Sequence, residues 1–171
     1  DGNMLAGGLL QQSVQRQMEK KEMLRLRTEE NKKLLEEQAK RDARAAINCS
    51  DEDYNTLLRI VQAEAGVCDE KGKILVANVI INRVRSPRFP NTIRGVVYQA
   101  NQFSPVSNGS INRVRVTQET IDCVDRALAG EDYSQGALFF MNRGRSRSGA
   151  VGWFDRSLTY LFSHDGHEFF K

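Results

Sequence analysis

One carboxylate lies on a helical stripe that is otherwise aliphatic. A helix would place four residues on one face, at i, i+3, i+4 and i+7: Leu57, Ile60, Val61 and Glu64. A carboxyl group on a core-facing stripe loses contact with water, which disfavours its charged form and raises its pKa. A general acid that works near neutral pH needs such a pKa. The alternatives are that Glu64 pairs with a buried arginine or lies at the margin of the stripe.

The helix that carries Glu64 has recognisable signals at both ends. Ser50 is a favourable N-cap, and residues 51–53 place carboxylates in the first turn, where the helix dipole favours anions. Gly66 is a favourable residue for the C-terminal end of this helix. A second helix is predicted over about residues 72–85, because aliphatic residues recur there at helical spacing. Asn82 on this second helix is expected to hydrogen-bond backbone near the first helix and so to position Glu64.

The residues that follow predict short elements separated by turns. The pair Asn108-Gly109 is a tight-turn signal and predicts a short hairpin. Thr117 is suited to cap a third helix that ends at Gly130. Arg, Ser and Gly dominate residues 144–152, which predicts a basic loop. One or two helical turns are expected at residues 93–98, and a short apolar strand or buried turn at residues 137–141.

The first part of the chain differs in texture from the rest. Residues 9–46 contain no Gly or Pro and consist mostly of strong helix formers with opposite charges at helical spacing. This predicts one long exposed helix, but its apolar positions keep no clean heptad, so a coiled coil is not established. We therefore predict two regions, a helical arm over residues 1–48 and a compact domain over residues 49–171. The arm is expected to be a spacer, a weak self-association segment, or a docking segment for a partner protein.

The composition excludes several classes of protein. Among 171 residues, 40% are hydrophobic and 27% are charged, as in ordinary globular proteins. The formal net charge of +3 does not demand an anionic polymer, and no nucleic-acid partner is predicted. No stretch is apolar enough to span a membrane. Residues 4–10 do not resemble a signal peptide, and because the chain opens on Asp1 we expect a processed or truncated piece.

The cysteines are too few and too scattered for a disulfide framework or a zinc site. Cys49, Cys68 and Cys123 are expected to be free, buried thiols. The alternative is that one pair forms a disulfide in an oxidising compartment and leaves one thiol over.

Six ordered blocks of sequence resemble the catalytic domain of the spore cortex-lytic enzyme family, bacterial cell-wall hydrolases that act during germination. The blocks lie at residues 60–66 (IVQAEAG), 76–84 (VANVIINRV), 89–98 (FPNTIRGVVY), 102–106 (QFSPV), 137–142 (ALFFMN) and 166–169 (GHEF). The resemblance implies a mainly α fold (α+β with a small hairpin), a lysozyme-like catalytic domain preceded here by a long N-terminal helix. It also implies a lytic transglycosylase that cleaves peptidoglycan glycan strands, with Glu64 as the essential acid.

Such an enzyme can work with one carboxylate. Five other acidic residues are candidates for a second one, and each is better interpreted as a loop or surface charge: Asp69, Glu70, Asp155, Asp165 and Glu168. Neither a metal nor an organic cofactor is then required. Side chains in or beside the matched blocks are candidates for binding sugar hydroxyl groups, acetamido groups or ring faces: Gln102, Phe103, Ser104, Phe140, Asn142, Trp153 and His167. Asn82 and Tyr98 are supporting candidates. Arg143, Arg145 and Arg147 are candidates for contacting acidic stem peptides, or they form a solvated basic loop.

Two other functions stay open at this point. The first is a hydrolytic muramidase or glucosaminidase, which would need a second catalytic carboxylate. The second is a wall-binding or assembly module that keeps the fold without the chemistry. The resemblance implies a location in the spore or cell envelope.

Overall fold

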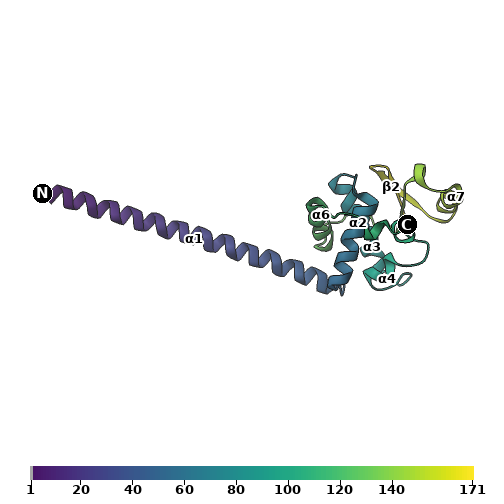
Figure 1. Ribbon diagram of the computed structural model, residues 1–171, viewed down its shortest axis with the longest axis horizontal. Helices are drawn as coiled ribbons and strands as arrows, with labels where there is room; N and C mark the ends of the chain where they lie inside the picture. Colours follow the sequence, from purple (N-terminus) through teal and green to yellow (C-terminus); the bar gives the residue numbers. More distant parts are fainter. Residues whose placement is uncertain (1) are drawn as a thin grey trace. The chain divides into compact units, whose positions relative to one another are not determined.

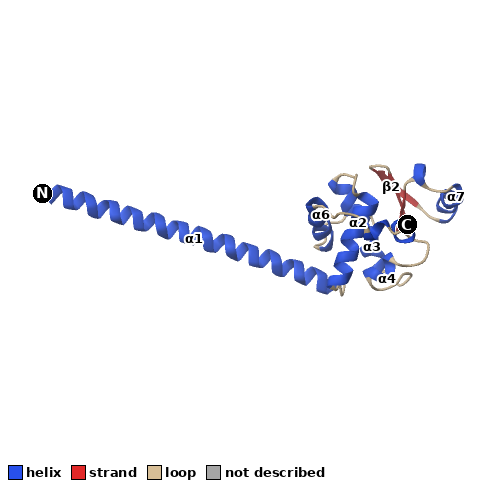
Figure 2. Cartoon of the chain, in the orientation of Figure 1, coloured by secondary structure: helices blue, strands red, loops and turns tan. Residues whose placement is uncertain are grey.

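The computed structural model describes residues 2–171, with side chains described from Met4 onward. The chain divides into two compact units, one ending at Ala39 and the other covering Lys40–Lys171. Figure 1 shows the order of the elements and Figure 2 their type. Helices predominate over a small sheet, which confirms the predicted mainly α fold. No helix among residues 2–171 is long and apolar enough to cross a membrane.

The N-terminal helix, α1 (Gly2–Ala46), is continuous and solvated over most of its length. Every side chain described from Met4 to Ala39 is exposed, as the sequence predicted. Neighbouring turns are joined by ion pairs, in which Arg25 donates to Glu22 at 3.0 Å and to Glu29 at 2.9 Å. The predicted roles of this helix, as a spacer, a self-association segment or a docking segment for a partner protein, stay predictions.

The last turns of α1 belong to the second unit. The Arg44 guanidinium lies 3.5 Å from the centre of the Tyr54 ring and 3.6 Å from the Asp125 carboxylate. The Tyr54 hydroxyl donates to the same carboxylate at 2.7 Å. These contacts explain why the compact unit begins at Lys40 rather than after residue 48.

Four helices build the core of the second unit: α2 (Asp51–Ala65), α3 (Glu70–Arg85), α4 (Ile93–Val97) and α6 (Gln118–Leu128). Ser50 and Asp53 cap α2 reciprocally, each side chain accepting from the other residue's backbone N–H. Thr117 caps α6 as predicted, accepting from the N–H of Thr120. Most residues of α3 are buried, and they lie on all faces of the helix, so α3 is the centre of the core.

A three-stranded antiparallel sheet closes the domain, in the order β1 (Phe139–Met141), β3 (His167–Phe170), β2 (Tyr160–His164). Strands β2 and β3 form a hairpin through Asp165 and Gly166, whose φ angles are 48° and 84°. Positive φ at both turn positions is the geometry that Asp-Gly favours. The predicted small hairpin therefore exists, but at a different place in the chain.

The hairpin predicted at Asn108-Gly109 is wrong. Two short helical elements occupy this region, α5 (Ser104–Ser107) and η1 (Ser110–Asn112). Gly109 has a φ of 78° and links the two elements, while the Asn108 side chain accepts from the N–H of Ser110 at 2.8 Å. The flanking residues lack the alternating apolar pattern that a strand pair needs, so the turn residues end a helix instead.

The basic loop predicted at residues 144–152 is also wrong. This stretch contains the short η2 (Arg143–Arg145) and the first half of α7 (Ser148–Ser157). Val151, Phe154 and Leu158 pack against the apolar face of the sheet. Their i, i+3, i+7 spacing is a helical signal, but the Gly and Ser residues around it obscured the signal.

All three cysteines are free thiols. Cys68 and Cys123 are buried, as predicted, whereas Cys49 is only half-buried. Burial raises the pKa of each thiol, for Cys49 to about 11. Thiols with raised pKa values are poor nucleophiles at neutral pH, so these side chains act as small apolar groups.

Candidate active site

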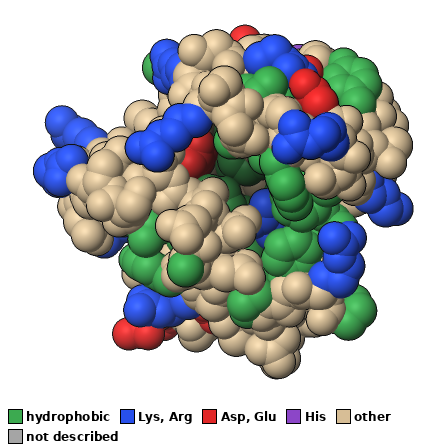
Figure 3. All heavy atoms as spheres, turned by 90° about the vertical axis from the view of Figure 1, so that its right-hand side faces the viewer, with side chains coloured by type: hydrophobic (Ala, Val, Ile, Leu, Met, Phe, Trp, Pro, Cys, Tyr) green, Lys and Arg blue, Asp and Glu red, His purple; other side chains and the backbone are tan. Residues whose placement is uncertain are grey.

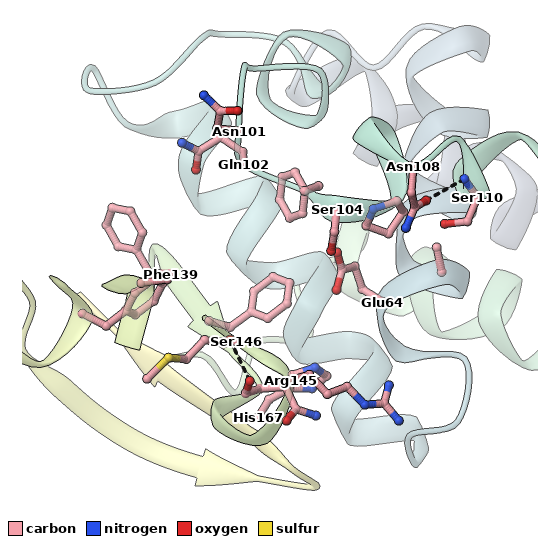
Figure 4. A pocket seen from close by; sticks show the side chains of 18 of the residues that line it. Glu64, Asn101, Gln102, Ser104, Asn108, Ser110, Phe139, Arg145, Ser146 and His167 are labelled. Carbon is pink, nitrogen blue, oxygen red and sulfur yellow. Dashed lines mark hydrogen bonds between the residues drawn. The ribbon is translucent and has the colours of Figure 1, made fainter. Parts of the chain in front are cut away.

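A cavity of about 610 Å³ opens in the Lys40–Lys171 unit. Its wall comes from the end of α2, the segment around α5, β1 with the residues after it, α7 and β3. Figure 3 shows one face of the molecule hollowed, with hydrophobic side chains in the hollow, and Figure 4 shows the cavity residues close by. Nine side chains that the sequence singled out line this cavity: Glu64, Gln102, Phe103, Ser104, Phe140, Asn142, Arg145, Trp153 and His167.

Glu64 is half-buried in the last turn of α2, and its carboxylate points into the cavity (Figure 4). Behind it, Leu57, Ile60 and Val61 are fully buried, as the stripe predicted. Desolvation raises the pKa of Glu64 to about 7. A large fraction of these carboxyl groups is therefore protonated at neutral pH and able to donate a proton.

Glu64 has no ion pair or hydrogen bond with any side chain among the residues that the structure describes. A buried arginine is present, but Arg83 donates to the carbonyl oxygen of Leu138 and to the side chain of Gln102. The interpretation of Glu64 as the partner of a buried arginine is therefore wrong. Its proton is available to a ligand.

Within the described part of the chain, Glu64 is the one acidic side chain on the cavity wall. Asp155 and Glu168 are both held by Arg143, at 2.8 and 2.7 Å. The other acidic residues considered as a second carboxylate do not line the cavity either: Asp69, Glu70 and Asp165.

The aromatic side chains differ in how much ring face they offer to a ligand. Trp153 is 45% exposed. It packs against Phe139 in a T-shaped arrangement, with 5.9 Å between the ring centres. Phe103 is 5% exposed and packs against Phe140 at 6.1 Å. Trp153 is thus the aromatic residue best placed to stack on a sugar ring, while the two phenylalanines form the wall.

His167 lies on β3 against Phe140, with ring centres 5.3 Å apart. Its Nδ1 atom is 3.9 Å from the Cys68 thiol, and burial lowers the pKa of the imidazole. The ring is therefore neutral at pH 7, which makes it a hydrogen-bonding group rather than a cation in the cavity.

Arg83 is a cavity residue that sequence reasoning missed. It is 4% exposed and lies among the rings of Phe89, Phe103 and Phe139 at 4.9 to 5.3 Å. A signal existed, because Arg83 follows Val76 and Ile80 at helical spacing, the same pattern that singled out Glu64.

The arginines after β1 do not share one role. Arg143 forms ion pairs with Asp155 and Glu168, so its charge is already balanced. Arg145 lines the cavity and is exposed, without a carboxylate within ion-pair distance among the described residues. Arg147 does not line the cavity. Of the three arginines, Arg145 is thus the one placed to contact an anionic group in the cavity.

Two supporting residues are not where the sequence suggested. Asn82 does not line the cavity and makes no contact with α2 through its amide, which donates to Ser134 Oγ and to the carbonyl oxygen of Ala137, both at 2.9 Å. It ties α3 to the segment that leads into β1. Tyr98 is 44% exposed, carries Arg94 over its ring, and also lies away from the cavity.

Replacing Asn82 with alanine is expected to destabilise the fold and to spare the chemistry. The change leaves the Ala137 carbonyl without its donor, which lowers the free energy of unfolding by about 1–2 kcal/mol. Urea unfolding would measure this loss. Any catalytic activity of the cavity, assayed at a temperature where the variant is folded, would change less than about twofold, because no cavity contact is lost. A folded Asn82→Ala protein with a 100-fold slower reaction would show instead that Asn82 positions Glu64.

Comparison with known proteins identifies the family of this domain. Residues 69–170 match the family described as Cell Wall Hydrolase, more than half of the chain. The chain belongs to the cell wall hydrolase family. The matched segment of this cell wall hydrolase begins five positions after Glu64, so the role of that residue rests on the geometry of the cavity.

Relatives of this cell wall hydrolase have related names. The spore cortex-lytic enzyme of Halalkalibacterium halodurans is 34% identical over 102 residues, which are 60% of this chain and 31% of that protein. The spore cortex-lytic enzyme of Oceanobacillus iheyensis is 32% identical over 115 residues, 67% of this chain and 41% of that protein. The chain therefore spans less than half the length of either relative.

A solved structure shares the fold of this cell wall hydrolase. The catalytic domain of the germination-specific lytic transglycosylase SleB from Bacillus anthracis superposes with a TM-score of 0.63 at 28% sequence identity. The superposition covers 71% of this chain and 96% of that domain. The lysozyme-like fold class predicted from the sequence is confirmed.

Proposed function

We propose that this cell wall hydrolase cleaves the glycan strands of peptidoglycan as a lytic transglycosylase, with Glu64 as the single catalytic carboxylate. The observation that carries the proposal is a carboxyl group that is alone on the cavity wall and unpaired among the described residues, with its pKa raised to about 7. Membership of the family supports peptidoglycan as the substrate, and the names of the relatives support spore cortex. The location that follows is the spore or cell envelope.

The first step would be proton transfer from Glu64 to the glycosidic oxygen as the bond from that oxygen to C1 breaks. The positive charge that develops at C1 needs stabilisation, which the substrate's own N-acetyl oxygen can supply. The 6-hydroxyl of the same sugar then attacks C1 and forms the 1,6-anhydro ring. Glu64, now ionised, accepts the proton of that hydroxyl and returns to its starting state.

The rival function is hydrolysis. An inverting or retaining glycosidase places two carboxyl groups across the scissile bond, about 5 to 9.5 Å apart. Among the described cavity residues, the side chains other than Glu64 include aromatic rings and amides but no second carboxylate. This distribution favours attack by a hydroxyl of the substrate over attack by a water molecule that a second carboxylate would activate.

A non-catalytic wall-binding module is the third possibility. Such a module has no use for an unpaired, desolvated acid, which destabilises the folded state at neutral pH. Glu64 combines half-burial with the lack of any partner among the described side chains, so the structure favours an enzyme.

Product chemistry tests the proposal. Purified spore-cortex peptidoglycan would be digested in water enriched in ¹⁸O, and the fragments analysed by mass spectrometry. We expect anhydromuramic acid ends that carry no ¹⁸O, because no water adds across the broken bond. Reducing ends that contain ¹⁸O would identify a hydrolase, and the absence of any fragment would remove the enzymatic proposal.

A further inference from the structure

Arg83 is a buried cation without a carboxylate partner among the described residues. Its Nε donates to the carbonyl oxygen of Leu138 at 2.7 Å, and its Nη1 donates to Gln102 Oε1 at 3.1 Å. Desolvation lowers its pKa to about 10, which leaves the guanidinium charged at neutral pH. Burying a charge this way is costly, so the donors of the guanidinium must be satisfied by groups held in place.

The contact between Arg83 and Gln102 determines how the Gln102 amide is turned. A guanidinium has only donors, so the amide atom that faces it has to be the carbonyl oxygen. The NH₂ group of Gln102 is then directed away from Arg83. Gln102 is exposed on the cavity wall, and its NH₂ group has no acceptor among the described residues. The cavity wall therefore carries a pair of exposed N–H donors whose orientation is set from the core.

The same arginine is linked to the exposed aromatic residue of the cavity. The Phe139 ring lies 5.1 Å from the Arg83 guanidinium and packs against Trp153 at 5.9 Å. An oriented N–H donor and an exposed ring thus belong to one packed group of side chains. This pairing matches a ligand that has a carbonyl acceptor beside an apolar ring face.

We propose that Gln102, oriented by Arg83, donates a hydrogen bond to the acetamido carbonyl of an N-acetylated sugar, with Trp153 covering the sugar's apolar face. The proposal rests on the proposed function, since it names the substrate group that this cavity selects. A sugar hydroxyl can also accept from an N–H group, but an amide carbonyl is the stronger acceptor and extends farther from the sugar ring. A fixed NH₂ group therefore favours an N-acetylated sugar over one with a hydroxyl at the same position. In this arrangement Arg83 is a positioning residue.

The test is the affinity of the 171-residue chain for two neutral β-1,4-linked probes, measured by titration calorimetry. One is chitotetraose, which carries acetamido groups, and the other is cellotetraose, which carries hydroxyl groups. We expect chitotetraose to bind the parent more tightly. Gln102→Glu keeps the side-chain length and an acceptor for Arg83 but removes the NH₂ donor. It is expected to weaken chitotetraose binding by about tenfold or more, with little effect on cellotetraose.

The matched control is Asn108→Asp. Asn108 lines the same cavity and uses its side-chain oxygen to accept from Ser110, so this variant keeps its bond and adds the same charge. Asn108→Asp should bind chitotetraose within about twofold of the parent, because the NH₂ group that it removes takes no part in the proposed contact and salt screens the added charge. An equal loss in both variants would mean that charge, not the lost donor, weakens binding, and would overturn the proposal.

A double-mutant cycle tests the positioning role of Arg83. If Arg83 acts through Gln102, then Arg83→Lys should weaken chitotetraose binding in the parent and have no further effect in Gln102→Ala. Additive losses would assign Arg83 a separate role. Failure of the parent to bind chitotetraose, or unchanged binding by Gln102→Glu, would overturn the inference. Binding and cleavage are measured separately, so the two proposals can fail independently. If the parent forms anhydromuramic ends but Gln102→Glu binds chitotetraose normally, the proposed function stands and the role of Gln102 is overturned.

Discussion

Replacing Glu64 with glutamine is expected to slow glycan cleavage by about 10³-fold or more, because the neutral amide cannot deliver a proton to the leaving oxygen. The carboxylate is the one acidic group among the described residues of the cavity wall, so no neighbour can take over its role. Release of soluble muropeptides from cortex peptidoglycan would measure the rate. Glu64→Asp should also be slow, by about 100-fold, since the shorter side chain withdraws the proton from the scissile bond.

The matched control is Glu52→Gln on the same helix. The Glu52 side chain is 79% exposed and lies 3.9 Å from Arg94 in a solvated ion pair. Its replacement should leave the cleavage rate within about twofold, because surface pairs of this kind contribute little. Substantial cleavage by Glu64→Gln would contradict the assignment of Glu64 as the acid, whichever products are formed.

The second large effect is on stability. Glu64→Gln is expected to be more stable than the parent at pH 8 and equally stable at pH 4. Below about pH 4.5 the carboxyl group is protonated in the folded and unfolded chains alike. Between pH 4.5 and about 7 the unfolded chain loses the proton while the folded chain keeps it, so the parent loses stability as the pH rises. Above pH 7 the loss is complete.

The size of this effect follows from the pKa. A rise from 4.5 to about 7 corresponds to about 3 kcal/mol, and the remaining contact of Glu64 with the cavity solvent lowers our expectation to about 2 kcal/mol. Urea unfolding of the parent, Glu64→Gln and Glu52→Gln at pH 4 and pH 8 would measure it. The other titratable groups contribute equally to the unfolding free energies of the three proteins, so their contributions cancel when these free energies are compared. If the parent and Glu64→Gln lose stability equally with pH, then the carboxyl group is not desolvated.

The cleavage rate should follow the same titration. A general acid acts in its protonated form, so kcat/KM is expected to fall by about tenfold per pH unit above pH 7. A profile that stays flat to pH 9 would mean that proton donation by Glu64 does not limit the reaction.

Several features of the fold follow from short stretches of sequence. The stripe of Leu57, Ile60 and Val61 and the Ser50 cap predict α2, and each depends on residues within two turns of one helix. The two tight-turn signals show the limit of such reasoning. Asp165-Gly166 joins two strands, whereas Asn108-Gly109 joins two helical elements. A dipeptide favours a turn, but the residues on either side decide which elements it connects.

Contacts across the chain decided most of the site. The sequence offered several carboxylates as partners of Glu64, and the structure removes Asp155 and Glu168 by binding both to Arg143, 12 and 25 positions away. Asn82 is on the predicted helix but contacts residues more than 50 positions later. Pair contacts of this kind depend on how elements pack, which helical periodicity does not encode.

The sequence by itself placed Glu64 on an otherwise aliphatic face of a helix whose end is marked by Gly66. Only the tertiary structure decided that Glu64 lacks a side-chain partner among the described residues, that Arg83 turns the Gln102 amide, and that Trp153 on α7 lines the same cavity. The reason is physical. A helix face depends on neighbours within a few residues, whereas the environment of a charge depends on every element packed around it.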